Sequence, residues 1–517
     1  MEQADVRSSN VFDRFAVAGV LIAVAAIPLT RSLVLPVVGP RLTLFELIAF
    51  PTIAAWLIAR TVSCTWRSVR LCPTLDVPLA LFWMLAAVSG LSAYRDLGAP
   101  ALIPFGIELT VLTYLLLLFL AARDLISRHQ MFGAVLTAWA SAVLLVGLVG
   151  AVGIGEMVRC TRPLSSLTYD GARLLATFRN PNQVAAYLVP SVVLFTALWA
   201  STRRLRWGHF AVAAALTGTC VLYFAASRGG DVAAIAGWIG ILLLLPGRPA
   251  ARVVAAMTAL VFVLSGWALV MKSAGNACFL YVGNTVTTMT LQLPASLRQA
   301  RELADSAVSQ PDASVPLDER QPPDNLDHPS MMVLQHITPH GGQHHVVLVN
   351  ETEGLELAGA TTESGETIPQ GSDTSTSLAF RRVMARIAWH YALAHPITGV
   401  GLGTMHLRVQ QSTGRLANVD AHNMTMTVLA ETGFAGAALF TWIIVWFLWS
   451  GAVAAYRAAD PAVRALQASV LAALSAYLVM ALSFDGQRQR VLWMLLAVLF
   501  AAIHCESAPH DAHSTDA

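Results

Sequence analysis

The sequence contains few charged residues. Asp, Glu, Lys and Arg make up 12% of its 517 residues, whereas hydrophobic residues make up 56%. This balance is typical of a membrane protein and not of a soluble domain. The formal net charge is only +2, and the arginines are scattered over many loops. The sequence therefore also argues against nucleic acid as a partner.

Cysteine is scarce as well, and the six cysteines show no metal-binding spacing. Only Cys160 and Cys278 fall in loops that the charge pattern, described below, assigns to the outer side of the membrane. An oxidising compartment would let these two pair. A disulfide needs a geometry that the sequence does not supply, so the paired and the free forms both stay open.

Long apolar runs, in contrast, are abundant. They are continuous and do not alternate between polar and apolar residues, which favours membrane-spanning helices over a β-barrel. We therefore predict an all-α, polytopic membrane protein of about twelve helices, each near the roughly 20 residues that a span needs. The first helix is expected to be a retained anchor and not a cleaved signal. The predicted spans are 15–30, 43–59, 77–93, 101–122, 132–153, 184–200, 208–226, 229–246, 253–271, 424–449, 465–482 and 491–505.

The arginines predict how the chain is oriented. They recur in alternate loops, which the positive-inside rule places in the cytoplasm. The chain then divides into spans over 1–271, a periplasmic loop over 272–423, spans over 424–505 and a cytoplasmic tail over 506–517. The arginines that carry this prediction are Arg60, Arg67, Arg70, Arg123, Arg128, Arg203, Arg204, Arg206, Arg248, Arg252, Arg457 and Arg464.

The long periplasmic loop has two parts. Residues from about 295 to 380 are rich in Asp, Glu, Ser, Thr, Pro and Gly, and we expect much of this part to be mobile. From 378 to 395, apolar residues recur at helical spacing and predict an amphipathic helix on the outer surface. The helix should end at Pro396 and Gly399.

Two patterns in this loop invite functional readings that we do not favour. The histidines lack the fixed helical spacing of a metal site, so we interpret them as solvated loop residues. The glycine run at 399–403 follows no strand and lacks dinucleotide-binding spacing, so we interpret it as a sharp turn. The histidines concerned are His328, His336, His340, His344 and His345.

Two polar sequences interrupt the apolar segments on the same side of the membrane. The run 208–246 would extend ~58 Å as one helix, against a hydrocarbon core of ~30 Å, so it must turn near Arg228. Arg228 at this interface is either a functional cation or a snorkelling anchor. At 178–183, Asn180 or Asn182 can cap the next helix, with Pro181 in its first turn.

Acidic residues gather in the outer parts of the predicted spans, where an ionisable group is a functional candidate. We favour a role in pairing with arginines and orienting them over direct catalysis. Asp485, Arg488 and Arg490 either join this network or anchor the last helix. The acidic residues are Glu46, Glu108, Asp231 and Glu431.

His422 lies where the polar loop re-enters an apolar helix. Its unperturbed pKa of about 6.5 allows the neutral imidazole to accept a proton near neutral pH. Because it lies at the membrane surface, where a hydroxyl-bearing substrate can reach it, His422 is a candidate general base.

Four sequences together resemble the O-antigen ligase and polymerase-like superfamily of bacterial inner-membrane glycosyltransferases. The most specific is His422-Asn423, followed after nine residues by Gly433-Phe-Ala-Gly436. The resemblance covers about 175–270 and 380–500, and it leaves 295–375 unmatched. The other three sequences are Phe178-Arg-Asn-Pro-Asn182, Ser227-Arg-Gly229, and Arg386-Ile-Ala-Trp389 with His395-Pro-Ile-Thr-Gly-Val-Gly-Leu-Gly403.

The resemblance implies transfer of a glycan from undecaprenyl diphosphate to an acceptor hydroxyl at the periplasmic face, without nucleotide, metal or other cofactor. It implies that His422 acts as the base. Arginines suit the developing charge on the leaving diphosphate, because a guanidinium group binds two oxygens at once. The implied diphosphate-binding residues are Arg228, Arg386 and Arg179, and the implied supporting residues are Asn423, Glu431, Asp231 and Glu108.

We interpret the chain as an O-antigen ligase that acts on lipid A-core and is surrounded by membrane lipids. A polymerase that joins lipid-linked repeat units is the alternative within the family. A transporter or flippase is disfavoured, because the polar residues gather at one face and no internal repeat is found.

Overall fold

The structure is a computed structural model, and it describes most of the membrane part of the chain. Cys160, Cys278, the loop histidines, Arg179, His422 and Asp485 lie outside the described residues, as does most of 295–380. The described residues are 11–30, 43–63, 66, 71–158, 169–170, 173–178, 180–201, 205–225, 227–245, 247, 251–255, 331–335, 346–350, 374–413, 423–484 and 486–505.

The chain is all-α, as predicted. Two antiparallel hairpins are the exceptions: β1 (Tyr169–Asp170) pairs with β2 (Arg173–Leu174), and β3 (Met331–Gln335) pairs with β4 (Val346–Asn350). The helices are α1 (Val11–Ala26), α2 (Leu44–Val62), α3 (Pro73–Leu97), η3 (Ala99–Ala101), α4 (Leu102–His129), α5 (Phe132–Val158), α6 (Pro181–Ser201), α7 (Leu205–Ala225), α8 (Arg228–Leu244), α11 (Thr374–Ala394), α12 (Met405–Thr413), α13 (Met424–Arg457), α14 (Pro461–Ala481) and α15 (Arg490–Ile503).

Most predicted spans coincide with helices. Eight helices in the described part of the chain are long and apolar enough to cross a membrane. The shorter helices α1, α8 and α15 match three further predicted spans. The predicted span at 253–271 lies almost entirely outside the described residues, so the total of twelve stays a prediction. The helix break near Arg228 is confirmed, because α7 ends at Ala225 and α8 begins at Arg228.

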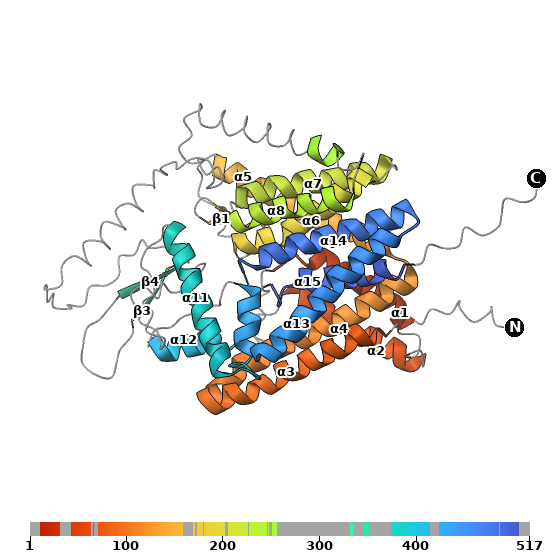
Figure 1. Cartoon of the computed structure of the whole chain (residues 1–517). Helices are drawn as coiled ribbons and strands as arrows, with labels where there is room; N and C mark the ends of the chain where they lie inside the picture. Colours follow the sequence, from red (N-terminus) through yellow and green to blue (C-terminus); the bar gives the residue numbers. More distant parts are fainter. Residues whose placement is uncertain are drawn as a thin grey trace, which may run out of the picture.

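The helices form a bundle in which α3, α4, α13 and α14 run along one another, and α11 crosses one end of it (Figure 1). The last helix, α15, packs against α4, α13 and α14. Its residues from Val491 to Ala502 are all buried. A helix that is apolar and buried all round belongs to a core, which explains how a 14-residue segment can be an integral part of the bundle.

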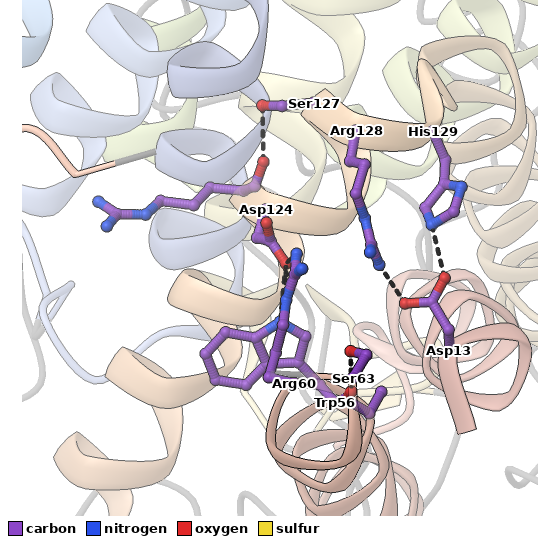
Figure 2. A network of polar contacts seen from close by, with 10 residues as sticks. Asp13, Trp56, Arg60, Ser63, Asp124, Ser127, Arg128 and His129 are labelled. Atoms are coloured by element: carbon purple, nitrogen blue, oxygen red, sulfur yellow. Dashed lines mark hydrogen bonds and ion pairs between the residues drawn. The ribbon is translucent and has the colours of Figure 1, made fainter. Parts of the chain in front are cut away.

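Ion pairs tie the helices together at the predicted cytoplasmic end. Asp13 of α1 pairs with Arg128 and His129 of α4, as Figure 2 shows. Asp124 accepts bonds from the Arg60 guanidinium group and from the Trp56 indole N–H, the latter at 2.8 Å. Buried charges need such partners, since an unpaired charge in an apolar interior is costly.

The ion pairs described in this article each join residues that the arginine pattern assigns to the same side of the membrane. The pairs of Asp13 and Asp124 lie at one end of the bundle, and those of Glu46 and Glu431 lie at the other. The alternation of the predicted loops is therefore consistent with the structure.

Candidate functional site

The candidate site is built around a break in α13. Gly433 lies in the first third of this helix and has φ 71° and ψ −175°, a conformation that favours glycine. The break takes the carbonyls of Ala430 and Glu431 and the N–H of Phe434 out of the regular helical pattern. Backbone groups at membrane depth need partners from elsewhere in the protein.

The glycine-rich turn at 396–403 supplies these partners. Val400 N–H donates to Ala430 O at 2.9 Å, and Phe434 N–H donates to Pro396 O at 2.7 Å. Gly399 has φ +65°, and a Cβ there would lie 2.3 Å from the carbonyl carbon of Glu431. The predicted sharp turn is thus confirmed, and its glycines allow it to pack directly on the backbone of α13.

Asn423 fixes the start of α13. Its Oδ1 accepts from the N–H groups of Thr425 at 3.0 Å and Met426 at 3.2 Å, and its Nδ2 donates to Leu482 O at 3.2 Å. Asn423 is therefore a helix cap that also ties α13 to the turn after α14. It directly follows His422, which lies outside the described residues.

A three-residue charge network lies just before the break. Glu431 is 1% exposed, and both of its carboxylate oxygens accept from Arg488 Nη2, at 2.6 and 2.5 Å. Arg488 Nε lies 3.3 Å from Glu108 Oε2 of α4. The turn between α14 and α15 thus supplies the arginine that two of the predicted acidic residues bind.

A small pocket opens beside this network. Gln487 is 4% exposed, and neither its Oε1 nor its Nε2 has a hydrogen-bond partner in the described part of the chain. An unsatisfied buried amide is unfavourable, so Gln487 is available to bind water or a polar ligand. The pocket is lined by Phe82, Glu108, Leu112, Leu402, Val428, Glu431, Thr432, Gln487 and Arg488.

Glu46 belongs to a separate cluster with Arg490. The Glu46 carboxylate accepts from the Tyr114 hydroxyl at 2.8 Å and from the N–H of Thr43 at 2.8 Å. Arg490 pairs with Glu46 and lies over the Phe45 ring, 4.5 Å from its centroid. These contacts form the capping box of α2 and join it to α15, so Glu46 has a structural role.

His395 joins the glycine-rich turn to α3. Its Nε2 lies 3.3 Å from Asp96 Oδ2, and Arg408 Nη2 donates to the same oxygen at 2.6 Å. Desolvation lowers the pKa of His395, and the charge of Arg408 lowers it further, whereas Asp96 opposes both effects. His395 therefore connects the outer loop to α3 through Asp96.

The structure brings together the two predicted sequences at 178–182 and 227–229. Ser227 caps α8 by accepting from Gly230 N–H at 3.4 Å, and its hydroxyl donates to Asn182 Oδ1 at 3.2 Å. The predicted cap of α6 is confirmed, because Asn180 Oδ1 accepts from Asn182 N–H at 2.7 Å. Arg179, the predicted cation of this segment, lies outside the described residues.

Arg228 and Asp231 lie in the first turn of α8. Arg228 is exposed, and Asp231 is partly buried and forms no ion pair with any described residue. The predicted pairing of Asp231 with an arginine is therefore not seen in this part of the chain. Asp231 differs in this respect from Glu431, which is paired with Arg488.

Arg386 lies on the predicted amphipathic helix, now seen as α11. This helix packs on α13, and Val383, Met384, Ile387 and Ala388 form its buried face. Arg386 lies on the opposite, exposed face.

The described residues include no cluster of three or more His, Cys, Asp or Glu side chains that could hold a metal ion.

The fold and these contacts define a class: an all-α, multi-pass membrane protein with a broken helix and paired charges at one end of the bundle. Residues 212–441 match the family model described as O-antigen ligase. The matched part contains α8, α11 and the break in α13, and the match supports the predicted resemblance to the O-antigen ligase family. No curated protein matches the chain.

Sequence reasoning missed Gln487 and the pairing of Arg488 with Glu431. The sequence leaves open whether Arg488 joins the acidic network or anchors the last helix, and its partner Glu431 is 57 residues away in the chain. The polar sequence Gln487-Arg488-Gln489-Arg490 between two apolar spans was the available signal. It is short, and no spacing rule connects it to α13.

Proposed function

We propose that the protein is an O-antigen ligase, which transfers a glycan from undecaprenyl diphosphate to lipid A-core at the periplasmic face of the bacterial inner membrane. The match to the family model supports a ligase or polymerase type of glycosyl transfer. The main support is that the family match includes α8, α11 and the break in α13, the elements that carry Arg228, Arg386 and the sequence after His422.

In the proposed reaction, an acceptor hydroxyl oxygen attacks the anomeric carbon of the glycan. The bond from this carbon to the diphosphate oxygen breaks, and the hydroxyl proton passes to His422, the general base. Arg228, Arg386 and Arg179 bind the diphosphate and stabilise the negative charge that grows on the leaving oxygen. Three guanidinium groups would supply the positive charge without a metal ion.

The supporting residues would act by placing these groups. Asn423 caps α13 directly after His422, and Glu431 fixes the same segment of α13 to Arg488. Glu108 adds a second anion beside Arg488. Asp231 lies in the first turn of α8 with Arg228, and its proposed role is to place a negative charge near that arginine without a direct ion pair.

The domain organisation is part of the proposal. The spans over 1–271 and 424–505 would form the membrane body, and 272–423 would lie in the periplasm with α11 and α12 at its end. The termini, including 506–517, would lie in the cytoplasm. The ion pairs of Asp13 and Glu431, which lie at opposite ends of the bundle, support this arrangement.

A polymerase is the second candidate, because the superfamily that the sequence resembles also includes polymerases, which need the same lipid-linked donor. A deletion strain separates the two. Loss of all O-chain from lipopolysaccharide, with lipid-linked polymer retained, is the outcome expected for a ligase. Attachment of a single repeat unit would instead indicate a polymerase, and unchanged lipopolysaccharide banding would contradict both functions.

A further inference from the structure

The turn between α14 and α15 contacts three of the segments that form the candidate site. Its described residues are 482–484 and 486–489, which we call the α14–α15 turn. These residues lie outside 212–441, the part of the chain that matches the family model. The proposed reaction gives no role to the part of this turn that precedes Arg488, so its contacts need their own explanation.

The first contact joins the turn to the start of α13. Asn423 Nδ2 donates to Leu482 O at 3.2 Å, while Oδ1 of the same side chain caps α13. A Cβ at Gly486 would lie 2.9 Å from Met424 Sδ, so the turn packs closely on the first residue of α13. The buried Tyr477 hydroxyl donates to Gly486 O at 2.7 Å. The turn is therefore fixed both to α14 and to the residues that directly follow His422 in the chain.

The second contact joins the turn to the start of α8. Gly229, the residue after Arg228, lies against Ser483, and a Cβ at Gly229 would overlap Ser483 Oγ and lie 3.1 Å from Ser483 Cβ. The Ser483 hydroxyl is held by a 2.8 Å hydrogen bond to Met480 O. Helices α8 and α14 pack on each other in the bundle, as Figure 1 shows. Because glycine has no side chain, the first turn of α8 can approach the α14–α15 turn this closely.

These contacts belong to a longer connected path. Ser227, the cap of α8, donates to Asn182 Oδ1 in the first turn of α6. At the other end of the path, Arg488 binds the two carboxylate oxygens of Glu431 just before the break in α13. One short turn thus contacts the start of α8, the start of α13 and the segment before the break. Closely packed interiors transmit small displacements, so a shift of this turn moves its neighbours.

We propose that the α14–α15 turn is a positioning element that fixes the separation of Arg228 from His422. It acts on Arg228 through Ser483, and on His422 through Leu482. The inference rests on the proposed function, which makes Arg228 a cation on the diphosphate and His422 the base. Since the base must reach the acceptor hydroxyl while the diphosphate is bound, a small displacement between the two residues slows transfer and leaves donor binding intact.

Gly229→Ala tests the contact with α8, because the added methyl group displaces the first turn of α8 from Ser483. We expect kcat to fall about tenfold, while donor KM and the Kd for undecaprenyl diphosphate without glycan stay within about twofold of the wild type. Ser483→Gly opens a gap and should lower kcat about threefold. The double variant Gly229→Ala/Ser483→Gly refills the gap and should return to within about threefold of the wild type, whereas independent effects would multiply to about thirtyfold.

Gly240→Ala is the matched control on the same pair of helices. A Cβ at Gly240 would lie 3.8 Å from Ala472 Cβ, an ordinary contact, so kcat should not change. The unfolding temperature of each variant is measured as well, because a purely structural effect lowers it and leaves kcat per folded molecule unchanged. Wild-type kcat in Gly229→Ala, or a double variant as slow as independent effects require, would overturn the proposal.

Asn423→Ser tests the contact with α13. Serine keeps an oxygen that caps a helix, and it lacks the Nδ2 group that binds Leu482 O. We expect kcat to fall about fivefold, with the Kd for undecaprenyl diphosphate unchanged, because one hydrogen bond that holds the start of α13 is lost. Wild-type kcat in this variant would show that Asn423 acts only as a cap and would contradict the proposed action on His422.

Disulfide crosslinking tests the contact of Ser483 without turnover. In a background without other cysteines, Gly229→Cys/Ser483→Cys should crosslink on mild oxidation as readily as the control pair Gly240→Cys/Ala472→Cys. The Cβ separations are 3.1 and 3.8 Å, close to the ~3.8 Å of disulfides. A crosslink that forms only in the control pair would show that the turn does not contact α8 and would overturn the proposal.

The same set of assays distinguishes failure of the positioning role from failure of the proposed function. Absence of glycan transfer by the folded wild type would remove the proposed function, and the positioning role with it. Transfer by the wild type with unchanged kcat in Gly229→Ala and Asn423→Ser would keep the function and remove only the positioning role.

Discussion

At the scale of single residues, the contacts of Arg488 explain how a broken helix is held inside the bundle. Its guanidinium group neutralises Glu431, which is 1% exposed, and approaches Glu108. The sequence placed all three residues near the outer face, and it predicted that acidic groups pair with arginines. It could not select the partner, because pairing between distant loops depends on how the helices pack.

Arg488→Gln should destabilise the protein by about 3 kcal/mol or more, because it leaves Glu431 buried without its cation. The double variant Arg488→Gln/Glu431→Gln removes both charges and should recover much of this loss. Thermal unfolding of the purified variants in detergent measures the effect. A single variant as stable as the wild type would show that Glu431 does not depend on Arg488.

At the scale of elements, the helices were largely predictable from the sequence, whereas their irregularities were not. Apolar runs predicted the spans, and the spacing at 378–395 predicted α11, which the structure confirms as Thr374–Ala394. The break at Gly433 was not predicted, because the apolar run 424–449 continues through it. The partners of the broken backbone come from 396–401, thirty or more residues earlier in the chain.

Gly433→Ala tests whether the break is built into α13. Alanine at φ 71° is strained, and its Cβ would lie 2.6 Å from Pro396 O, so we expect a loss of about 1–3 kcal/mol and a displaced turn. Gly106→Ala on α4 is the control, since a Cβ there meets nothing within 4 Å. It should be neutral or slightly stabilising. Equal unfolding temperatures for the two variants would argue against a required break.

At the scale of the whole molecule, the arginine pattern predicted two sets of loops, and the ion pairs respect that division. The described ion-pair partners of Asp96 all belong to the predicted outer loop. Asp13 pairs with residues at the predicted inner end of α4. Which set faces the cytoplasm is a separate prediction from the positive-inside rule.

Cysteine labelling tests this orientation. In a background without other cysteines, Ala99→Cys should react with a membrane-impermeant maleimide added to intact cells, because Ala99 is exposed at the predicted outer end. In a second variant that keeps native Cys72 as its single cysteine, Cys72 should react only after the inner membrane is permeabilised. The reverse pattern would place the candidate site in the cytoplasm and contradict the proposed function.

Transfer of glycan by the purified protein tests the central claim most directly. The protein is given undecaprenyl-diphosphate-linked glycan and lipid A-core in the presence of a chelator. We predict transfer by the wild type and loss of about 100-fold or more in His422→Ala, which should still bind the donor. Arg228→Lys and Arg386→Lys should also fail if two-oxygen contacts are required. Absence of transfer by the folded wild type, or full activity of His422→Ala, would contradict the account.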